Sequence, residues 1–283
     1  MSEASARRAI AWLDVFTDRP FAGNQLAVIL DADGLSDEQM QSMARELTIS
    51  ESIFASDGGR AIRIFTPGYE LPGAGHPVIG VTHELVRRGV IPNVGEWTYR
   101  TVRGETAVTV GDGVATMTQP EPQLGTEHDA AAVAAALQID ERDLASVPQT
   151  CNTGVNQLFA EMRDRETLAA LHPDMDLVAG LDGAEGIAAW CELGGGAVAQ
   201  RFFAPLMGIP EDPATGSAAG ALGALRVFRG AEPGPLTVRQ GDEVGRPSEI
   251  RVSVGGEAGY PADVRVGGRA VLVFEGEVEI PAG

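Results

Sequence analysis

Short apolar segments, separated by turns rich in glycine and proline, recur along most of the chain. Segments of this length are typical of β-strands. In the first half the pattern predicts strands at 9–16, 25–30, 61–65, 97–102, 106–110 and 115–119. In the second half it predicts strands at 156–162, 186–193, 197–203, 236–240, 249–254, 262–266 and 270–280. The segment 120–128 is predicted to be a connection between the halves.

Fewer segments have the period of an amphipathic helix. One begins at Ser36, which forms a capping-box pattern with Gln39, and continues to about Leu47. Further helices are predicted at 78–88, 129–137 and 166–171, and another follows Thr-Gly-Ser at 215–217. A few helices among many strands indicate an α+β fold.

Three sequence features of the first half recur in the second half in the same order. GNQL at 23–26 is matched by GVNQL at 154–158, and RIFTP at 63–67 is matched by RFFAP at 201–205. The segments 75–89 and 216–230 have equal length, and both end in Arg-Gly. The repeat predicts two domains of similar fold, at 1–120 and 121–283, with the last strand a candidate to return to the first domain.

The segment EDPATGSAAG at 211–220 leads from an acidic loop into a helix. Thr215 and Ser217 are residue types that cap helix starts, so we expect the first backbone N–H groups to point back at Asp212. Helix starts attract anions, and the small residues around Gly216 let a ligand approach the backbone. The segment is therefore predicted to form the floor of a binding site.

The repeat also suggests how such a site is completed. If the halves face each other about a pseudo-twofold axis, the helix starts at 75–76 and 216–217 meet and can bind a carboxylate-bearing substrate. Four carboxylates in or near the loops are candidate acids and bases: Glu51, Glu70, Glu211 and Asp212. The repeat alone does not choose among them.

Composition excludes several kinds of partner and site. The 283 residues carry a net charge of −19, which opposes binding to nucleic acid. Because the chain shows no signal-peptide pattern and no run of about 18 apolar residues, we expect a cytoplasmic protein that does not bind membranes. Cys151 and Cys191 are far apart, which indicates two buried thiols rather than a disulfide framework or a metal site.

Several long blocks closely resemble the phenazine-biosynthesis PhzF-like family. They are DVFTDRPFAGNQLAVIL, SESIF, RIFTPGYELPGAGHPVIG, RFFAPLMGIPEDPATGSAAG and QGDEVGRPS, and they follow the family's order over nearly the whole chain. The resemblance implies a diaminopimelate epimerase-like fold, in which each of two domains is a strongly bent sheet or barrel around a central helix. It also implies an active site between the domains, and a homodimer.

The resemblance further implies a cofactor-independent isomerase that uses a glutamate to move a proton within its substrate. The glutamate of the family's Ser-Glu-Ser/Thr segment falls on Glu51. By the same matching, His76 and Asp212 are catalytic candidates, and Gly75, Gly216 and Ser217 are substrate-binding candidates. In this assignment Asp212 holds a substrate amine or hydroxyl. His76 and the nearby N–H groups stabilise negative charge.

Two features of the sequence depart from the family's pattern. Gly73 stands where a larger residue is common, and the segment 150–157 lacks the basic and histidine residues of the phenazine enzyme. These departures argue against assuming an anthranilate-type substrate. Because neither Cys151 nor Cys191 falls in the AGHP or ATGS block, an epimerase with two catalytic thiols is disfavoured.

Other interpretations remain open. The chain can be a catalytically silent small-molecule binding protein, a two-base epimerase or racemase, or a structural protein whose domains mainly support dimerisation. Glu51 can be a surface carboxylate at a helix end, and His76 a turn residue. Ser217 and Asp212 can serve only as helix caps. Glu70 and Glu211 are interpreted as structural or supporting groups.

Overall fold

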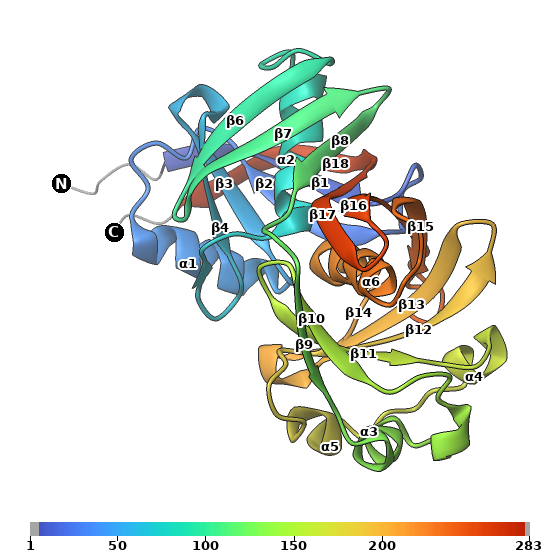
Figure 1. Cartoon of the computed structure of the whole chain (residues 1–283). Helices are drawn as coiled ribbons and strands as arrows, with labels where there is room; N and C mark the ends of the chain where they lie inside the picture. Colours follow the sequence, from blue (N-terminus) through green and yellow to red (C-terminus); the bar gives the residue numbers. More distant parts are fainter. Residues whose placement is uncertain (1–5, 281–283) are drawn as a thin grey trace. The chain divides into compact units, whose positions relative to one another are not determined.

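The computed structural model describes residues 6–280 and has an α+β architecture (Figure 1). These residues divide into two compact units. Unit 1 comprises residues 6–117 and 267–280, and unit 2 comprises residues 118–266. Within the described residues, no helix is long and apolar enough to cross a bilayer.

The strands of unit 1 form a sheet in the order β18, β1, β2, β3, β4, β6, β7, β8. Neighbours are antiparallel except for β2–β3 and β4–β6, which are parallel, and β5 pairs with β4. The strands are β1 (Ala6–Val15), β2 (Asn24–Ile29), β3 (Ser52–Ser56), β4 (Ala61–Phe65), β5 (Glu70–Leu71), β6 (Gly95–Thr101), β7 (Gly104–Gly111), β8 (Val114–Thr118) and β18 (Ala270–Ile280). The helices are α1 (Asp37–Leu47), the 3-10 turn η1 (Asp57–Gly59) and α2 (Gly75–Arg87).

The strands of unit 2 pair in the order β9, β10, β11, β12, β13, β15, β16. Here β11–β12 and β13–β15 are parallel, and β14 pairs with β13. The strands are β9 (Gln123–Glu127), β10 (Gln149–Asn152), β11 (Asn156–Glu161), β12 (Ile187–Gly194), β13 (Ala197–Ala204), β14 (Ile209–Asp212), β15 (Gly234–Gln240), β16 (Ser248–Glu257) and β17 (Tyr260–Gly268). The helices are α3 (Ala130–Leu137), α4 (Arg165–Ala169), α5 (Met175–Ala179) and α6 (Gly216–Phe228), with 3-10 turns η2 (Glu141–Asp143) and η3 (Pro205–Met207).

The internal repeat is present in the strand pairing of the two units. From β1 to β7 and from β10 to β16, the strands follow the same order of pairing. In each unit an antiparallel pair is followed by a parallel pair and then by an antiparallel hairpin. A short strand and a long helix come next, and after them a strand that pairs in parallel with the hairpin. Helices α2 and α6, of 13 residues each, occupy the same place in this order. The repeated sequence blocks thus encode a repeated topology.

Unit 1 packs helices against its sheet through alternating residues of β2. A Cβ at Gly80 of α2 would overlap Leu26 and lie 2.9 Å from Val15, so α2 packs directly on the sheet there. Ala27 and Ile29 belong instead to a separate core with α1. Because neighbouring residues of a strand point to opposite faces, α2 and α1 cover opposite faces of β2.

Unit 2 repeats this arrangement with different helices. Gly223 of α6 faces Val252 and Val254 of β16, and a Cβ at Gly223 would lie 2.9–3.0 Å from their methyl groups. A separate core joins α3, α4 and α5 to β11, β12 and β13, and it contains Val133, Leu168, Val178, Leu158 and Phe203. In unit 1, α2 and α1 therefore belong to different cores, and in unit 2, α6 belongs to a different core from α3, α4 and α5.

The structure confirms one predicted helix cap, moves the start of one predicted helix and contradicts one predicted connection. The capping box at Ser36 and Gln39 is confirmed, with both reciprocal hydrogen bonds present. Helix α2 begins at Gly75, three residues before the predicted start. The helix can include Pro77 because this residue lies in the first turn, where a backbone N–H has no partner within the helix. The prediction of a connection at 120–128 is wrong, since β9 lies there and pairs with β10. All five residues of β9 are exposed, so no apolar alternation marks it.

Candidate active site

Glu51 lies immediately before β3, a strand paired on both sides within unit 1. Its side chain is buried, with 9% of the residue exposed. Burial raises the pKa of Glu51 to about 7, while a hydrogen bond with Ser50 acts in the opposite direction. A carboxyl group with this pKa is partly protonated at neutral pH, so it can both accept and donate a proton.

His76 is the second residue of α2, and its imidazole faces Glu51. His76 Nε2 lies 3.5 Å from Glu51 Oε2, and His76 is 7% exposed. Among the described residues, Glu51 Oε2 is buried and accepts no hydrogen bond. Buried carboxylate oxygens normally have donors, so an exception beside a histidine is typical of a functional site.

The start of α2 is not capped by a side chain. Its N-cap residue is Ala74, which has no side-chain acceptor for the N–H groups of the first turn. Gly75 follows at the first helical position. Unit 1 therefore brings together three of the predicted site residues: Glu51, Gly75 and His76.

Asp212 lies at the end of β14 in unit 2, where β14 pairs with β13. Its Oδ2 accepts a hydrogen bond of 2.5 Å from Thr215 Oγ1. Thr215 Oγ1 in turn accepts a hydrogen bond from Gln240 Nε2 at 3.0 Å. Thr215 is the N-cap residue, but its hydroxyl does not cap α6 as its residue type suggested, because it contacts Asp212.

Ser217 is the second residue of α6, and it has a glutamine partner of its own. Gln157 Nε2 from β11 donates to Ser217 Oγ at 3.0 Å. On another side, Gln119 Nε2 donates to the Gly216 carbonyl at 3.1 Å, and Gln119 Oε1 accepts from Thr153 Oγ1. Unit 2 therefore brings together Asp212, Gly216 and Ser217 at the start of α6.

The three glutamines at the start of α6 were not predicted as site residues. Gln119, Gln157 and Gln240 come from three separate segments of the sequence, and only the fold brings them together. One signal was available for Gln157, because it lies in the repeated Asn-Gln-Leu block.

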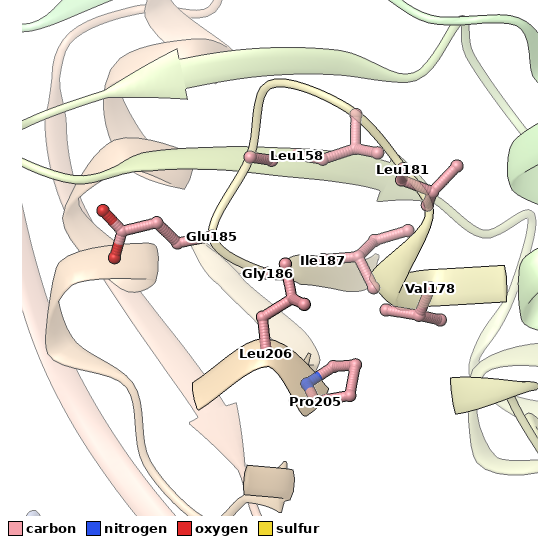
Figure 2. Close-up of a pocket in the computed structure, with 9 residues that line it drawn as sticks. Leu158, Val178, Leu181, Glu185, Gly186, Ile187, Pro205 and Leu206 are labelled. Carbon is pink, nitrogen blue, oxygen red and sulfur yellow. The ribbon is translucent and has the colours of Figure 1, made fainter. Parts of the chain in front are cut away.

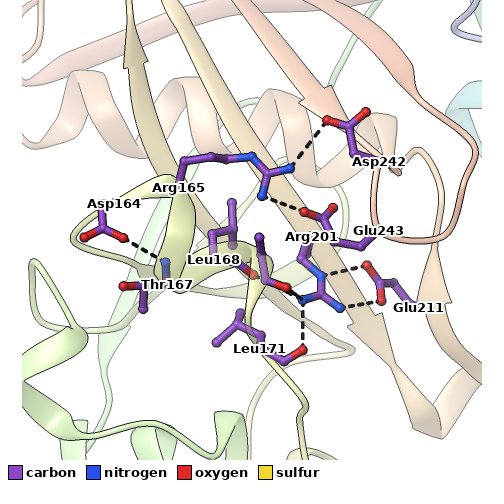
Figure 3. Close-up of polar contacts among 10 residues, drawn as sticks. Asp164, Arg165, Thr167, Leu168, Leu171, Arg201, Glu211, Asp242 and Glu243 are labelled. Atoms are coloured by element: carbon purple, nitrogen blue, oxygen red, sulfur yellow. Dashed lines mark hydrogen bonds and ion pairs between the residues drawn. The ribbon is translucent and has the colours of Figure 1, made fainter.

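Each unit also has a bidentate arginine–glutamate pair just before its long helix. In unit 1, Arg63 Nε and Nη2 donate to the two carboxylate oxygens of Glu70, each at 2.6 Å. In unit 2, Arg201 donates in the same way to Glu211, at 2.9 and 2.8 Å, as Figure 3 shows. These contacts agree with the structural interpretation of Glu70 and Glu211.

The unit 2 pair is the more buried of the two. Arg201 is 6% exposed, and its Nη1 also donates to the backbone carbonyls of Leu168, Ala169 and Leu171 (Figure 3). Glu211 directly precedes Asp212 in β14. The arginine therefore fixes the strand that carries Asp212.

Unit 2 also has a pocket, whose lining residues are shown in Figure 2. Its lining is mostly apolar and includes none of the predicted site residues: Leu158, Val178, Leu181, Ala184, Glu185, Gly186, Ile187, Pro205 and Leu206. The described residues contain no group of three histidine, cysteine or acidic side chains placed to hold a metal ion.

Comparisons with known proteins show the family to which the chain belongs. The family model for phenazine biosynthesis-like protein matches residues 13–276. The trans-2,3-dihydro-3-hydroxyanthranilate isomerase of Pseudomonas aeruginosa is 34% identical over 256 residues, covering 83% of this chain and 86% of that protein. The chain belongs to the phenazine biosynthesis-like (PhzF) family. The predicted family and fold class are thereby confirmed.

Two further proteins are similar to this chain over almost their full length. An uncharacterized isomerase of Pasteurella multocida (strain Pm70) is 31% identical and covers 96% of this chain and 94% of its own. The crystal structure of a PhzF family protein from Bacillus anthracis superposes with a TM-score of 0.87 at 26% identity, covering 96% of this chain and 99% of that one. Because curated relatives at 31% and 34% identity are named isomerases, the chain is an isomerase of the PhzF family.

More distant structures share only the fold. A hydroxyproline epimerase from Agrobacterium vitis has a TM-score of 0.61 at 15% identity, and the match covers 100% of this chain and 95% of that one. The PhzF fold of this chain is therefore an epimerase-like fold, as the resemblance implied.

Proposed function

We propose that this PhzF-family isomerase moves a proton within a small carboxylate-bearing substrate, with Glu51 as the acid and base and with no cofactor. The observation that carries the proposal is the environment of Glu51. Burial raises its pKa to about 7, and its Oε2, which accepts no hydrogen bond within residues 6–280, lies 3.5 Å from His76 Nε2. Such a carboxyl group is suited to taking a proton from one atom and returning it to another.

The proposed reaction balances without any other reactant. The Glu51 carboxylate takes a proton from a carbon next to an extended π-system, and the electron pair of the C–H bond enters that system. The same carboxyl group then gives the proton to a different carbon, which regenerates the carboxylate. In this scheme His76 and the N–H group of Gly75 stabilise the negative charge that develops on the substrate.

For the start of α6 we propose a role in substrate binding. Gly216 and Ser217 offer backbone N–H groups and a hydroxyl at a helix start, where a carboxylate is stabilised. Asp212, which is 7% exposed, is assigned to an amine or hydroxyl of the substrate. The relative that acts on a dihydro-hydroxyanthranilate suggests cyclic, unsaturated amino and hydroxy carboxylates as the first compounds to test.

The alternative of a two-base epimerase with thiols is not supported by the cysteines. Cys151 and Cys191 are buried in strands, and burial raises the pKa of Cys151 to about 12 and raises that of Cys191. Such thiols are not poised to form thiolates at neutral pH. A catalytically silent binding protein remains the second candidate, and catalytic turnover distinguishes it from the isomerase.

The test is proton NMR of the purified protein in D2O with a panel of cyclic amino and hydroxy carboxylates. We expect deuterium incorporation or isomerisation with the wild type, and nearly complete loss with Glu51→Gln. The matched control is Glu38→Gln, which changes an exposed carboxylate on α1. Near-normal turnover by Glu51→Gln would remove Glu51 from the mechanism. Binding of a compound without turnover would favour the silent binding protein.

We also propose that the protein is a cytoplasmic homodimer. Light scattering coupled to gel filtration tests the oligomeric state, and a monomer mass would contradict the proposal.

A further inference from the structure

Gln157 is a buried glutamine with a hydrogen-bond partner at only one end of its side-chain amide. It is 2% exposed, and its Nε2 donates to Ser217 Oγ at 3.0 Å. Its Oε1 is buried and accepts no hydrogen bond from any described residue. Buried amide oxygens nearly always have a donor. An oxygen without one, beside the start of a 13-residue helix, points to a ligand that supplies the donor.

The other two glutamines at the start of α6 serve as internal comparisons. Both ends of the Gln119 amide are occupied, by the Gly216 carbonyl and by Thr153 Oγ1. Both ends of the Gln240 amide are occupied as well, and its Oε1 accepts from Gln200 Nε2 and from the Thr215 N–H. Both ends of the Gln119 and Gln240 amides therefore have partners, whereas Gln157 Oε1 has none among the described residues.

The Gln240 chain shows what a glutamine does to a neighbouring hydroxyl. Gln240 Nε2 donates to Thr215 Oγ1, so the single hydroxyl proton of Thr215 is directed to the Asp212 carboxylate. Gln157 donates to Ser217 Oγ in the same manner. The Ser217 proton is thereby left to donate to a carboxylate at the helix start, as Thr215 does to Asp212.

The backbone holds the Gln157 side chain in this position. Strand β11 pairs with β10 on one side, where Gln157 lies opposite Cys151, and with β12 on the other. Residues on paired strands are held more precisely than residues on loops, as recognition of one substrate group requires.

We propose that Gln157 is a specificity-determining residue, whose Oε1 accepts a hydrogen bond from an amino or hydroxyl group next to the substrate carboxylate that Ser217 binds. The proposal rests on the binding role proposed above for the start of α6, and it narrows the substrate to carboxylic acids with a hydrogen-bond donor on a neighbouring atom. A site built to pair such a donor discriminates against analogues that lack it, because its buried acceptor is then left unpaired.

The test compares the binding of benzoate, 2-methylbenzoate and 2-aminobenzoate by isothermal titration calorimetry. We expect the wild type to bind 2-aminobenzoate about tenfold more tightly than the other two ligands, as one additional buried hydrogen bond predicts. Gln157→Met removes both polar ends of the side chain at similar size, and we expect it to abolish this preference. Gln149→Met, in the adjacent strand β10, is the matched control and keeps the preference.

A second variant separates recognition from folding. Gln157→Glu keeps an acceptor but places a negative charge near the carboxylate site, so we expect weaker binding of all three ligands with the preference for 2-aminobenzoate retained. A Gln157→Met protein that keeps the wild-type preference overturns the proposal. If that result comes with Glu51-dependent exchange, the proposed isomerase function still stands. If the wild type binds none of the ligands and catalyses no exchange, both proposals fail together.

Discussion

Glu51 Oε2 lies 3.5 Å from His76 Nε2, although the two residues come from different elements of unit 1. Glu51 directly precedes strand β3, and His76 lies in the first turn of α2. This distance exceeds that of an ordinary hydrogen bond, as contacts between catalytic groups often do in ligand-free structures. The relationship leads to predictions for stability as well as for catalysis.

The first prediction concerns the pH dependence of stability at Glu51. Because its pKa rises from 4.5 to about 7 on folding, the folded state binds more protons than the unfolded state between these values. The stability contributed by Glu51 therefore falls as pH rises through this window. Glu51→Gln does not titrate. Its stability relative to wild type should rise by on the order of 3 kcal/mol between pH 4 and pH 8.

Urea unfolding at a series of pH values measures this difference, and groups common to both proteins cancel in it. Glu38→Gln is the control, and its stability relative to wild type should not change with pH across the same range. A flat difference for Glu51→Gln would show that the carboxyl group titrates normally in the folded protein.

The second prediction compares the two arginine–glutamate pairs. Removing one partner of a buried ion pair leaves an uncompensated charge and costs about 3–5 kcal/mol, whereas exposed pairs contribute about 0–1 kcal/mol. The Arg201 side chain is 7% exposed and that of Arg63 is 32% exposed. We therefore expect Arg201→Met to lower the free energy of unfolding by several kcal/mol and Arg63→Met to lower it much less.

Denaturant midpoints of the two variants provide the measurement, and each variant serves as the control for the other. Equal losses would mean that burial does not determine the strength of these pairs. The Arg201 variant should also bind carboxylates more weakly, because the strand that carries Asp212 is anchored through Glu211.

The third prediction concerns the contact between α6 and Gln119. A Cβ at Gly220 would overlap Gln119 Oε1 and lie 2.8 Å from Val266 Cγ2. Overpacking of this kind costs about 1–3 kcal/mol. Gly220→Ala should therefore lower the melting temperature. Gly111→Ala, where a Cβ would meet no atom within 4 Å, should leave it almost unchanged. An unchanged melting temperature for Gly220→Ala contradicts this account of the packing.

The sequence predicted much of this structure because its strongest signals are local or repeated. The capping box at Ser36 involves residues three apart. The repeat marked both long helices and the strands that carry Arg63 and Arg201, but not the pairing of these arginines with glutamates. The residues around Gln157, Gln119 and Gln240 could not be foreseen in the same way. Their contacts join segments that are 60, 97 and 25 residues apart, and no local pattern encodes such distances.

The burial of Glu51 and its raised pKa also could not be predicted from the sequence. A glutamate in a Ser-Glu-Ser segment has no apolar pattern that reveals its burial, and the raised pKa follows from that burial. The family resemblance pointed to this residue, while the structure supplies the physical reason for its proposed role. Burial disfavours the charged form, so the proton is held at a pH where an ordinary glutamate has lost it.

The central claim is that the carboxyl group of Glu51 holds a proton near neutral pH. Carbon-13 NMR of protein labelled at the glutamate side-chain carboxyl carbons measures this directly, with Glu51→Gln used to assign the signal. The account predicts a titration midpoint of about 7 for Glu51 in the ligand-free protein. A midpoint near 4.5, the ordinary value for glutamate, would contradict it.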